Sequence, residues 1–216
     1  MQIIDNLLPE NQYYKEICDK TQIVLHHTVS NPISVKGDKD YWRSDISKIA
    51  TYAIIDYNGI VNRMFPSDMW AHHLGVKAIN LKALNFKDYS TRNILLNQNS
   101  IGIEIDNWGG LVKKEGLYYN CYGTPISKDL EVVECHWRGY KYYQKYSDAQ
   151  INTLKELLPI FVKRYNISTY GLKDGNFELR RDCLEGKSGI YSHSNYRNDK
   201  SDLYPDTRIV ELLKDL

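Results

Sequence analysis

Three features that mark other protein classes are missing from this sequence. No stretch approaches the run of roughly 18 apolar residues that a membrane-spanning helix needs, so no such span or membrane anchor is expected. The four cysteines lie far apart and form no C-x-x-C pair, which excludes a zinc ribbon and predicts reduced thiols. With 28 basic against 27 acidic residues, no charge excess predicts a nucleic-acid partner.

A targeting segment and internal boundaries are missing as well. Residues 1–17 have no basic start, no clean apolar core and no small-residue cleavage site, so they do not resemble a signal peptide. We therefore expect a chain made in the cytoplasm, which another factor must release if the substrate lies outside. No repeat, low-complexity tract or Pro/Gly/Ser-rich linker divides the chain. One monomeric domain over residues 1–216 is expected.

Three segments have the patterns of β-strands and their turns. Residues 21–28 carry the apolar run Ile-Val-Leu and end near two histidines, which is typical of a buried strand. Asn58-Gly59, between two β-rich runs, is a strong hairpin signal. In residues 100–106 three isoleucines alternate with other residues. Because strand side chains alternate between faces, Glu104 should point away from the isoleucines.

The helix signals lie mostly in the C-terminal half. Ser147 and Gln150 form a capping-box pattern ahead of apolar residues at helical spacing. Pro159 predicts a kink in this helix or a break just before the proline. A final helix is expected after Asp206, and a short one at residues 44–50 with Ser44 as its N-cap. Strands alternating with helices predict an α/β fold, with a mixed central β-sheet flanked by helices.

Two separate segments of the sequence carry histidines and a carboxylate, which are the residue types of an open zinc site. His26 and His27 close the strand at 21–28, and only one of them can face a given site. A strand histidine is by itself more often a hydrogen-bonded core residue than a metal ligand. His193, which ends a short strand predicted at 189–193, and Asp202 flank one polar loop that can fold back on a metal. His26, His193 and Asp202 would bind one Zn²⁺ and leave its fourth position for water.

Five short blocks of the sequence resemble those of a known family. They are IVLHHT, ATYAIIDYNGIV, WAHHLGV, SIGIEID and an H-x6-K-x-D pattern, in this order over positions 23–202. In them the chain resembles the type 2 N-acetylmuramoyl-L-alanine amidases, which include bacteriophage endolysins, cytosolic muropeptide amidases and peptidoglycan-recognition proteins. Each block is weak alone, whereas five in the family's order are specific.

The resemblance implies a fold, a reaction and a set of roles. The reaction is zinc-dependent hydrolysis of the amide bond between the lactyl group of N-acetylmuramic acid and L-alanine, so peptidoglycan or a muropeptide is the expected partner. His26, His193 and Asp202 match the family's zinc ligands. Glu104 would take the proton of the attacking water and pass it to the leaving amine. Lys200 would stabilise the oxyanion.

Residues 107–146 form an insertion rich in aromatic side chains, directly after the SIGIEID strand. One hypothesis is that it builds a wall of the substrate groove, in which Trp108 and Trp137 meet sugar rings and Arg138 meets a carboxylate. The rival hypothesis is a lobe packed on itself without ligand contact, and the sequence does not decide between them. His73, in the WAHHLGV block, is expected to line the groove rather than to bind zinc.

Two departures from the family pattern and three alternative functions stay open. Asp202 is followed by Leu-Tyr-Pro instead of Pro-Gly-Pro, so this loop must turn differently. Thr51 and Tyr52 stand where many relatives carry an orienting or catalytic tyrosine, and neither is assigned. A bacteriophage endolysin released through a holin is the first expectation for the biological role. A cytosolic muropeptide-recycling amidase and a non-catalytic peptidoglycan-binding receptor are the alternatives.

Overall fold

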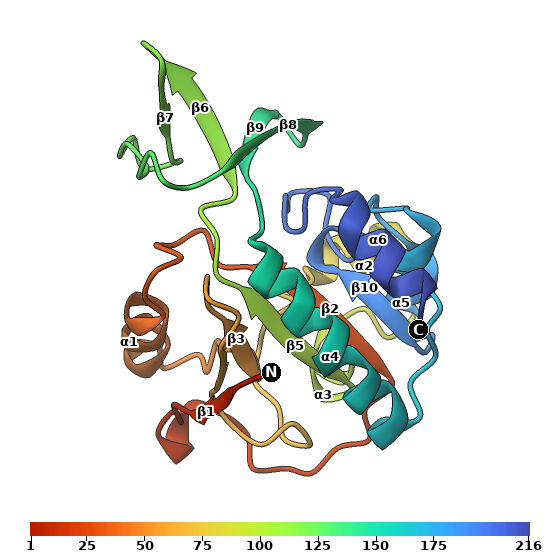
Figure 1. Cartoon of the computed structure of the whole chain (residues 1–216). Coiled ribbons are helices and arrows are strands. Elements are labelled where there is room, and N and C mark those ends of the chain that lie inside the picture. The colour runs from red at the N-terminus through yellow and green to blue at the C-terminus, as the bar shows by residue number, and fades with distance from the viewer.

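A six-stranded sheet forms the centre of the computed structural model, which describes residues 1–216 (Figure 1). The strand order is β1-β4-β3-β5-β2-β10, and only the β3–β4 hairpin is antiparallel. The strands of this sheet are β1 (Ile3–Asp5), β2 (Gln22–His27), β3 (Ala53–Ile55), β4 (Val61–Arg63), β5 (Ser100–Ile105) and β10 (Gly189–Ser192).

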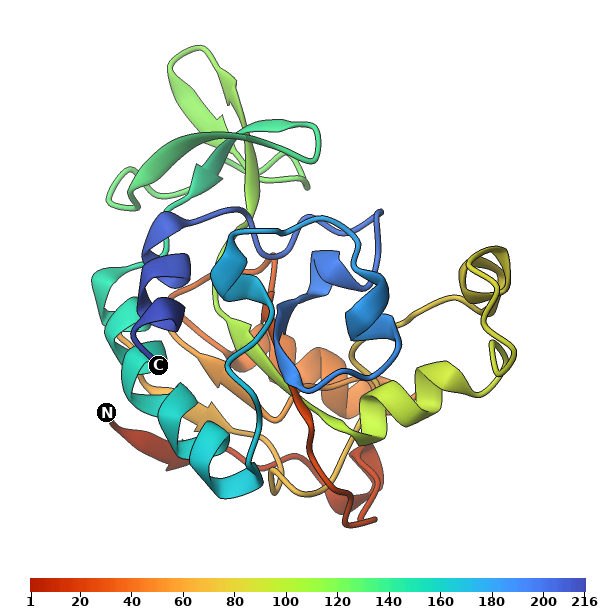
Figure 2. The same cartoon turned by 90° about the vertical axis from the view of Figure 1, so that its right-hand side faces the viewer.

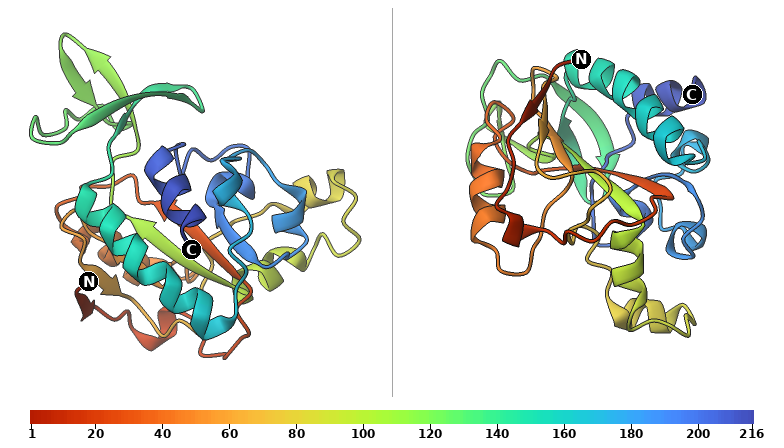
Figure 3. Two further views of the ribbon diagram at one scale, coloured as in Figure 1. Left: turned by 45° about the vertical axis from the view of Figure 1, so that its right-hand side comes forward. Right: turned by 90° about the horizontal axis from the view of Figure 1, so that it is seen from below.

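Helices cover both faces of the sheet, as Figures 2 and 3 show. The longest, α4, packs with α6 on one face, and α2, α3 and α5 lie toward the other. The helices are α1 (Lys36–Ser44), α2 (Ala78–Ala83), α3 (Arg92–Gln98), α4 (Asp148–Tyr165), α5 (Arg181–Leu184) and α6 (Thr207–Lys214), with short 3-10 turns η1 (Glu10–Gln12), η2 (Leu172–Asp174) and η3 (His193–Asn195). None of them is long and apolar enough to cross a membrane.

The alternation of side chains along the central strands produces two separate cores. Ile23 and Leu25 of β2 and Ile103 of β5 lie in the larger core, together with the apolar side chains of α4 and α6. Val24 points the other way, into a smaller core with residues of α2, α3 and α5. His26 and Glu104 are register partners in neighbouring parallel strands. Both therefore lie on the Val24 face, opposite the isoleucines.

The insertion forms a second sheet of four strands. Their order is β7-β6-β9-β8, and their bounds are β6 (Gly110–Lys114), β7 (Leu117–Tyr119), β8 (Val132–Trp137) and β9 (Tyr140–Gln144). Figure 1 shows this lobe standing on the end of the molecule where β5 leaves the main sheet. The lobe thus rises from the carboxyl ends of β2 and β5, where His26 and Glu104 lie.

The predicted α/β class is confirmed, as are most of the predicted elements. The strands at β2 and β5, the Asn58-Gly59 hairpin and the final helix after Asp206 are present. The Ser147–Gln150 capping box is also present, with Gln150 N–H donating to Ser147 Oγ at 3.1 Å.

One helix prediction is wrong in part, for the break before Pro159, and another is wrong. The helix α4 runs through Pro159 without a break, because a buried apolar face on both sides of the proline holds the two halves in one helix. The helix predicted at residues 44–50 is absent, and Ser44 instead ends α1. Its hydroxyl donates to the carbonyl of Tyr41 at 2.8 Å, so it bonds within the last turn rather than capping a following helix.

Candidate functional site

A cavity of about 270 Å³ opens at the carboxyl ends of β2 and β5. It collects residues that are far apart in the sequence and come from all five family-like blocks and from the segment between the first two. The chemically active side chains on its wall are His26, His73, Glu104, His193, Lys200 and Asp202. The arrangement follows from topology, because parallel strands bring their carboxyl ends to one edge of the sheet.

His26, His193 and Asp202 form a buried triangle of ligand atoms. The Nδ1 atoms of the two histidines are 3.0 Å apart, and Asp202 Oδ2 lies 2.9 Å from His193 Nδ1 and 3.3 Å from His26 Nδ1. Ligands about 2 Å from a tetrahedral zinc are separated from one another by about 3.3 Å. This is the chain's one cluster of three histidine, cysteine or carboxylate groups with metal-binding spacing.

The protonation of these groups also suits a metal. The Nε2 of His193 lies 2.9 Å from the carbonyl oxygen of Leu74. A carbonyl only accepts, so this nitrogen carries the proton and Nδ1 presents a lone pair. Beside Nδ1 stands the Asp202 carboxylate, another acceptor. Two acceptors at 2.9 Å repel each other unless a proton or a cation lies between them, and a divalent ion fits this donor set.

The pKa values of the buried ligands also favour metal binding. Burial and the neighbouring His193 together lower the pKa of His26 to about 4, against the effect of Asp202. Burial raises the pKa of Asp202, but His193 and His26 outweigh it and hold that pKa well below its usual value. A neutral imidazole and an ionised carboxylate are the forms that bind a metal.

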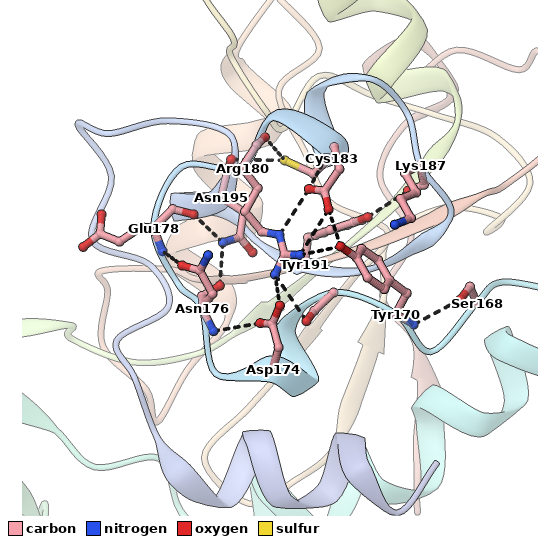
Figure 4. Close-up of polar contacts among 12 residues, drawn as sticks. Ser168, Tyr170, Asp174, Asn176, Glu178, Arg180, Cys183, Lys187, Tyr191 and Asn195 are labelled. Atoms are coloured by element: carbon pink, nitrogen blue, oxygen red, sulfur yellow. Dashed lines mark hydrogen bonds and ion pairs between the residues drawn. The ribbon is translucent and has the colours of Figure 1, made fainter.

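A network of loops fixes the position of His193. This residue begins η3, whose last residue, Asn195, is buried. The Asn195 side-chain amide donates to the carbonyls of Asn176 (2.9 Å) and Glu178 (2.8 Å), and the backbone N–H of Arg180 donates to the Asn195 carbonyl at 2.9 Å (Figure 4). The loop after η2 is thereby tied to the turn that carries the ligand.

Glu104 lies beside His26 on the same face of the sheet and lines the cavity. Its Oε2 is buried and has no hydrogen-bond partner within the protein. Burial raises the pKa of Glu104 well above its usual value, and the charge of Asp202 raises it further. A carboxyl group that lines a cavity, has a raised pKa and has an oxygen without a hydrogen-bond partner has the properties of a general base. Lys200 lines the same cavity as a cation.

The other predicted substrate-binding residues lie in different places. His73 lines the cavity, but Trp108, Trp137 and Arg138 do not. The Arg138 guanidinium pairs with the carboxylate of Glu178 at 2.5 Å and stacks on the Trp137 ring at 4.6 Å. The ion pair joins the lobe to the main body, whereas the stacking lies within the lobe. Substrate binding by these residues stays a prediction.

The histidines at positions 27, 72 and 136 bond to other protein groups, and Thr51 and Tyr52 lie in different environments. His27 points to the face opposite His26, where its Nδ1 bonds the hydroxyl of Tyr146 at 2.9 Å. His72 bonds the hydroxyl of Tyr14 at 3.3 Å. Tyr52 is packed in the larger core, whereas Thr51 reaches the cavity wall. His136 is exposed and pairs with Glu134.

Two contributors to the site were not predicted from the sequence. The backbone carbonyl of Leu74 has no sequence signature, because any residue supplies one. The buried side chain of Asn97 accepts the backbone N–H groups of His73 (2.8 Å) and Leu74 (3.1 Å). A polar residue at the end of a helix is ordinary in a sequence, so only the fold shows what Asn97 holds.

Comparison with known proteins agrees with this geometry. A sequence model described as N-acetylmuramoyl-L-alanine amidase matches residues 18–205. The chain belongs to the N-acetylmuramoyl-L-alanine amidase family and is an enzyme of that class. No match is found among curated protein sequences.

Solved structures share the fold at low sequence identity. PlyL is 12% identical with a TM-score of 0.52, over 100% of this chain and 96% of that one. LysC, an N-acetylmuramoyl-L-alanine amidase from Clostridium intestinale, is 14% identical with a TM-score of 0.51, over 100% and 97%. The hydrolase AmiA from Staphylococcus aureus, solved in complex with its ligand, is 11% identical with a TM-score of 0.55, over 100% and 82%.

Proposed function

We propose that this amidase is zinc-dependent and cleaves the bond between the lactyl group of N-acetylmuramic acid and the L-alanine of the stem peptide. The observation that carries the proposal is the triangle of His26, His193 and Asp202, whose three acceptor atoms lie 2.9–3.3 Å apart. Zinc bound there would supply a Lewis acid that polarises a carbonyl group and makes water more acidic.

The chain's own residues would carry the proton transfers. Glu104, which lines the cavity and whose buried Oε2 has no hydrogen-bond partner, takes a proton from the water that attacks the lactyl carbonyl. It then gives that proton to the nitrogen of L-alanine as the carbon–nitrogen bond breaks. The products are a lactyl carboxylic acid and a stem peptide with a free amine. General acid-base catalysis of this kind contributes about 10²- to 10⁴-fold.

Lys200 would act on the charge that develops at the carbonyl oxygen. It lies on the cavity wall two residues before Asp202, so the same loop places the metal ligand and the cation. A donor aimed at a developing oxyanion is worth about 3 to 4 kcal/mol of transition-state stabilisation.

The biological role that we propose is an endolysin that degrades the bacterial cell wall. Two of the structural neighbours are described as endolysins, one from Clostridium intestinale and a mutant from Bacillus subtilis. Release through a holin and a monomeric state belong to this proposal. A role in muropeptide recycling differs in that it predicts a preference for free muropeptides over intact wall.

Product identity tests the proposed reaction. The purified protein is incubated with a defined muropeptide, with and without a chelator, and the products are identified by mass. We expect free stem peptide and an intact glycan, loss of both products with the chelator, and recovery when zinc is added. Cleavage within the glycan or within the peptide would contradict the proposal.

A further inference from the structure

His26 begins a chain of hydrogen bonds that runs away from the cavity. Its Nε2 lies 3.0 Å from His73 Nδ1, and His73 Nε2 lies 2.8 Å from Ser100 Oγ. Ser100 Oγ lies 2.7 Å from the carbonyl oxygen of Leu96. The chain therefore ends on a backbone carbonyl, which can only accept a hydrogen bond.

The carbonyl at the end fixes the direction of every bond before it. Ser100 must donate its single proton to Leu96, so it accepts from His73 Nε2–H. A neutral imidazole carries one N–H, so His73 Nδ1 is an acceptor and receives the Nε2–H of His26. The Nδ1 of His26 is then left without a proton, at the corner of the ligand triangle. His73 thus selects the tautomer of His26 that can bind a metal.

The residue after His73 does the same for the second histidine. The carbonyl of Leu74 accepts the Nε2–H of His193 at 2.9 Å, which leaves His193 Nδ1 free as a ligand atom. Two consecutive residues of one segment therefore set the tautomer and the ring orientation of both imidazoles. One of them uses its side chain and the other uses its backbone.

The segment itself is held on two sides. The side-chain oxygen of Asn97 accepts the N–H groups of His73 (2.8 Å) and Leu74 (3.1 Å). On the sheet side, the His73 ring lies against Gly102, where an added Cβ would stand 2.9 Å from His73 Nδ1. Real Cβ contacts are not that close, so a glycine at this position lets the ring approach β5.

We propose that His73 and Leu74, anchored by Asn97, form a positioning element that orients both histidine ligands, and that His73 does not bind substrate through its ring nitrogens. Both of those nitrogens are already bonded to protein groups. The proposal rests on the zinc site proposed above. Residues that hydrogen-bond a ligand histidine through the nitrogen that does not bind the metal contribute about 10- to 100-fold to metal affinity.

The test compares His73→Phe with His72→Phe. Phenylalanine keeps a flat ring over Gly102 but cannot accept the His26 N–H. His72 is the matched control, because it is the adjacent histidine and bonds Tyr14 instead of a ligand. The zinc Kd is measured by competition with a chelator of known affinity, and the Tm of the metal-free protein is measured beside it.

We expect His73→Phe to weaken zinc binding about 10- to 100-fold, and His72→Phe to leave it within about twofold of the starting protein. His73→Asn, whose side-chain oxygen replaces the Nδ1 acceptor, should recover most of the loss. The visible spectrum of the Co²⁺-loaded protein should change in His73→Phe and return in His73→Asn. A role confined to folding would lower the Tm of the metal-free protein without these changes.

The outcomes separate this proposal from the proposed function. If the unmodified chain binds no zinc, the zinc site fails and the positioning role fails with it. If the unmodified chain binds zinc and His73→Phe binds it equally well, only the positioning role is overturned. Should His73→Phe not fold, Ser100→Ala decides the matter, because it keeps the His73 ring and removes the acceptor of its Nε2–H. An unchanged zinc Kd in a folded Ser100→Ala protein would also overturn the role.

Discussion

The indole N–H of Trp137 donates to the backbone carbonyl of Ser201 at 3.0 Å. Ser201 stands between Lys200 and Asp202, so the lobe bonds the loop that carries two of the site residues. The Trp137 ring also packs edge-on against Phe177, with ring centroids 6.3 Å apart. Through Trp137 the lobe is therefore physically connected to the site, whether or not the lobe binds substrate.

Trp137→Phe tests this connection. Phenylalanine keeps an aromatic ring beside Phe177 but loses the N–H, so the free energy of unfolding should fall by about 1 kcal/mol. We also expect a lower kcat, because the loop with Lys200 loses a fixed point. Urea unfolding and steady-state kinetics measure the two effects. The control is Trp108→Phe, since Trp108 meets the lobe through its backbone N–H, which bonds Gln144.

If the lobe instead forms a wall of the substrate groove, replacing its tryptophans should change KM rather than stability. If Trp137 or Trp108 contacts the glycan, its replacement raises KM for peptidoglycan and leaves the stability nearly unchanged. A raised KM with an unchanged free energy of unfolding in Trp137→Phe would therefore favour the groove hypothesis over the connection described above.

Glu104→Gln separates catalysis from metal binding. The amide has the shape of the carboxyl group but cannot take a proton from water, so kcat should fall about 10²- to 10⁴-fold. Zinc content should stay at one ion per chain, because Glu104 is outside the ligand triangle. Metal analysis and kcat on one muropeptide are the measurements. Activity equal to that of the starting protein would place the general base elsewhere.

Asp106 gives the protein a pH-dependent stability. Burial, together with the charge of Asp38, raises its pKa to about 7. The folded protein then holds a proton that the unfolded chain loses near pH 4. The resulting stabilisation is complete below about pH 4 and is lost as the pH rises through about 7.

Asp106→Asn should remove this dependence. Asparagine retains an oxygen that accepts the hydroxyls of Thr28 and Ser30, both 2.9 Å from Oδ1. Between pH 4 and pH 8 the starting protein should lose on the order of 2 to 4 kcal/mol more unfolding free energy than the variant. Chemical unfolding of both proteins across this range is the check. Parallel stability curves would show that Asp106 ionises normally in the fold.

Much of the fold could be predicted from local patterns. The Ile-Val-Leu run, the Asn58-Gly59 turn and the Ser147–Gln150 box each specify structure within a few residues, and each is present. The helix α1 could not be predicted, because its residues are mostly polar and only Trp42 is buried. Such a helix depends on packing more than on its own sequence.

For the site as well, some residues could be predicted from the sequence and others could not. The sequence identifies His26, His193 and Asp202 as residue types suited to zinc, and the fold brings these three into one cluster. The roles of the Leu74 carbonyl and Asn97 could not be predicted, since they depend on where α3 and the segment before α2 meet. The Trp137–Ser201 bond is likewise a contact between distant parts of the chain.

A zinc titration of the metal-free protein tests the central claim most directly. Amide cleavage is measured as zinc is added, and bound zinc is counted in the same samples. We predict that activity rises in proportion to bound zinc and stops rising at one ion per chain, and that Asp202→Asn neither binds zinc tightly nor gains activity. Full activity in the metal-free protein, or zinc binding that is unchanged in Asp202→Asn, would contradict the account.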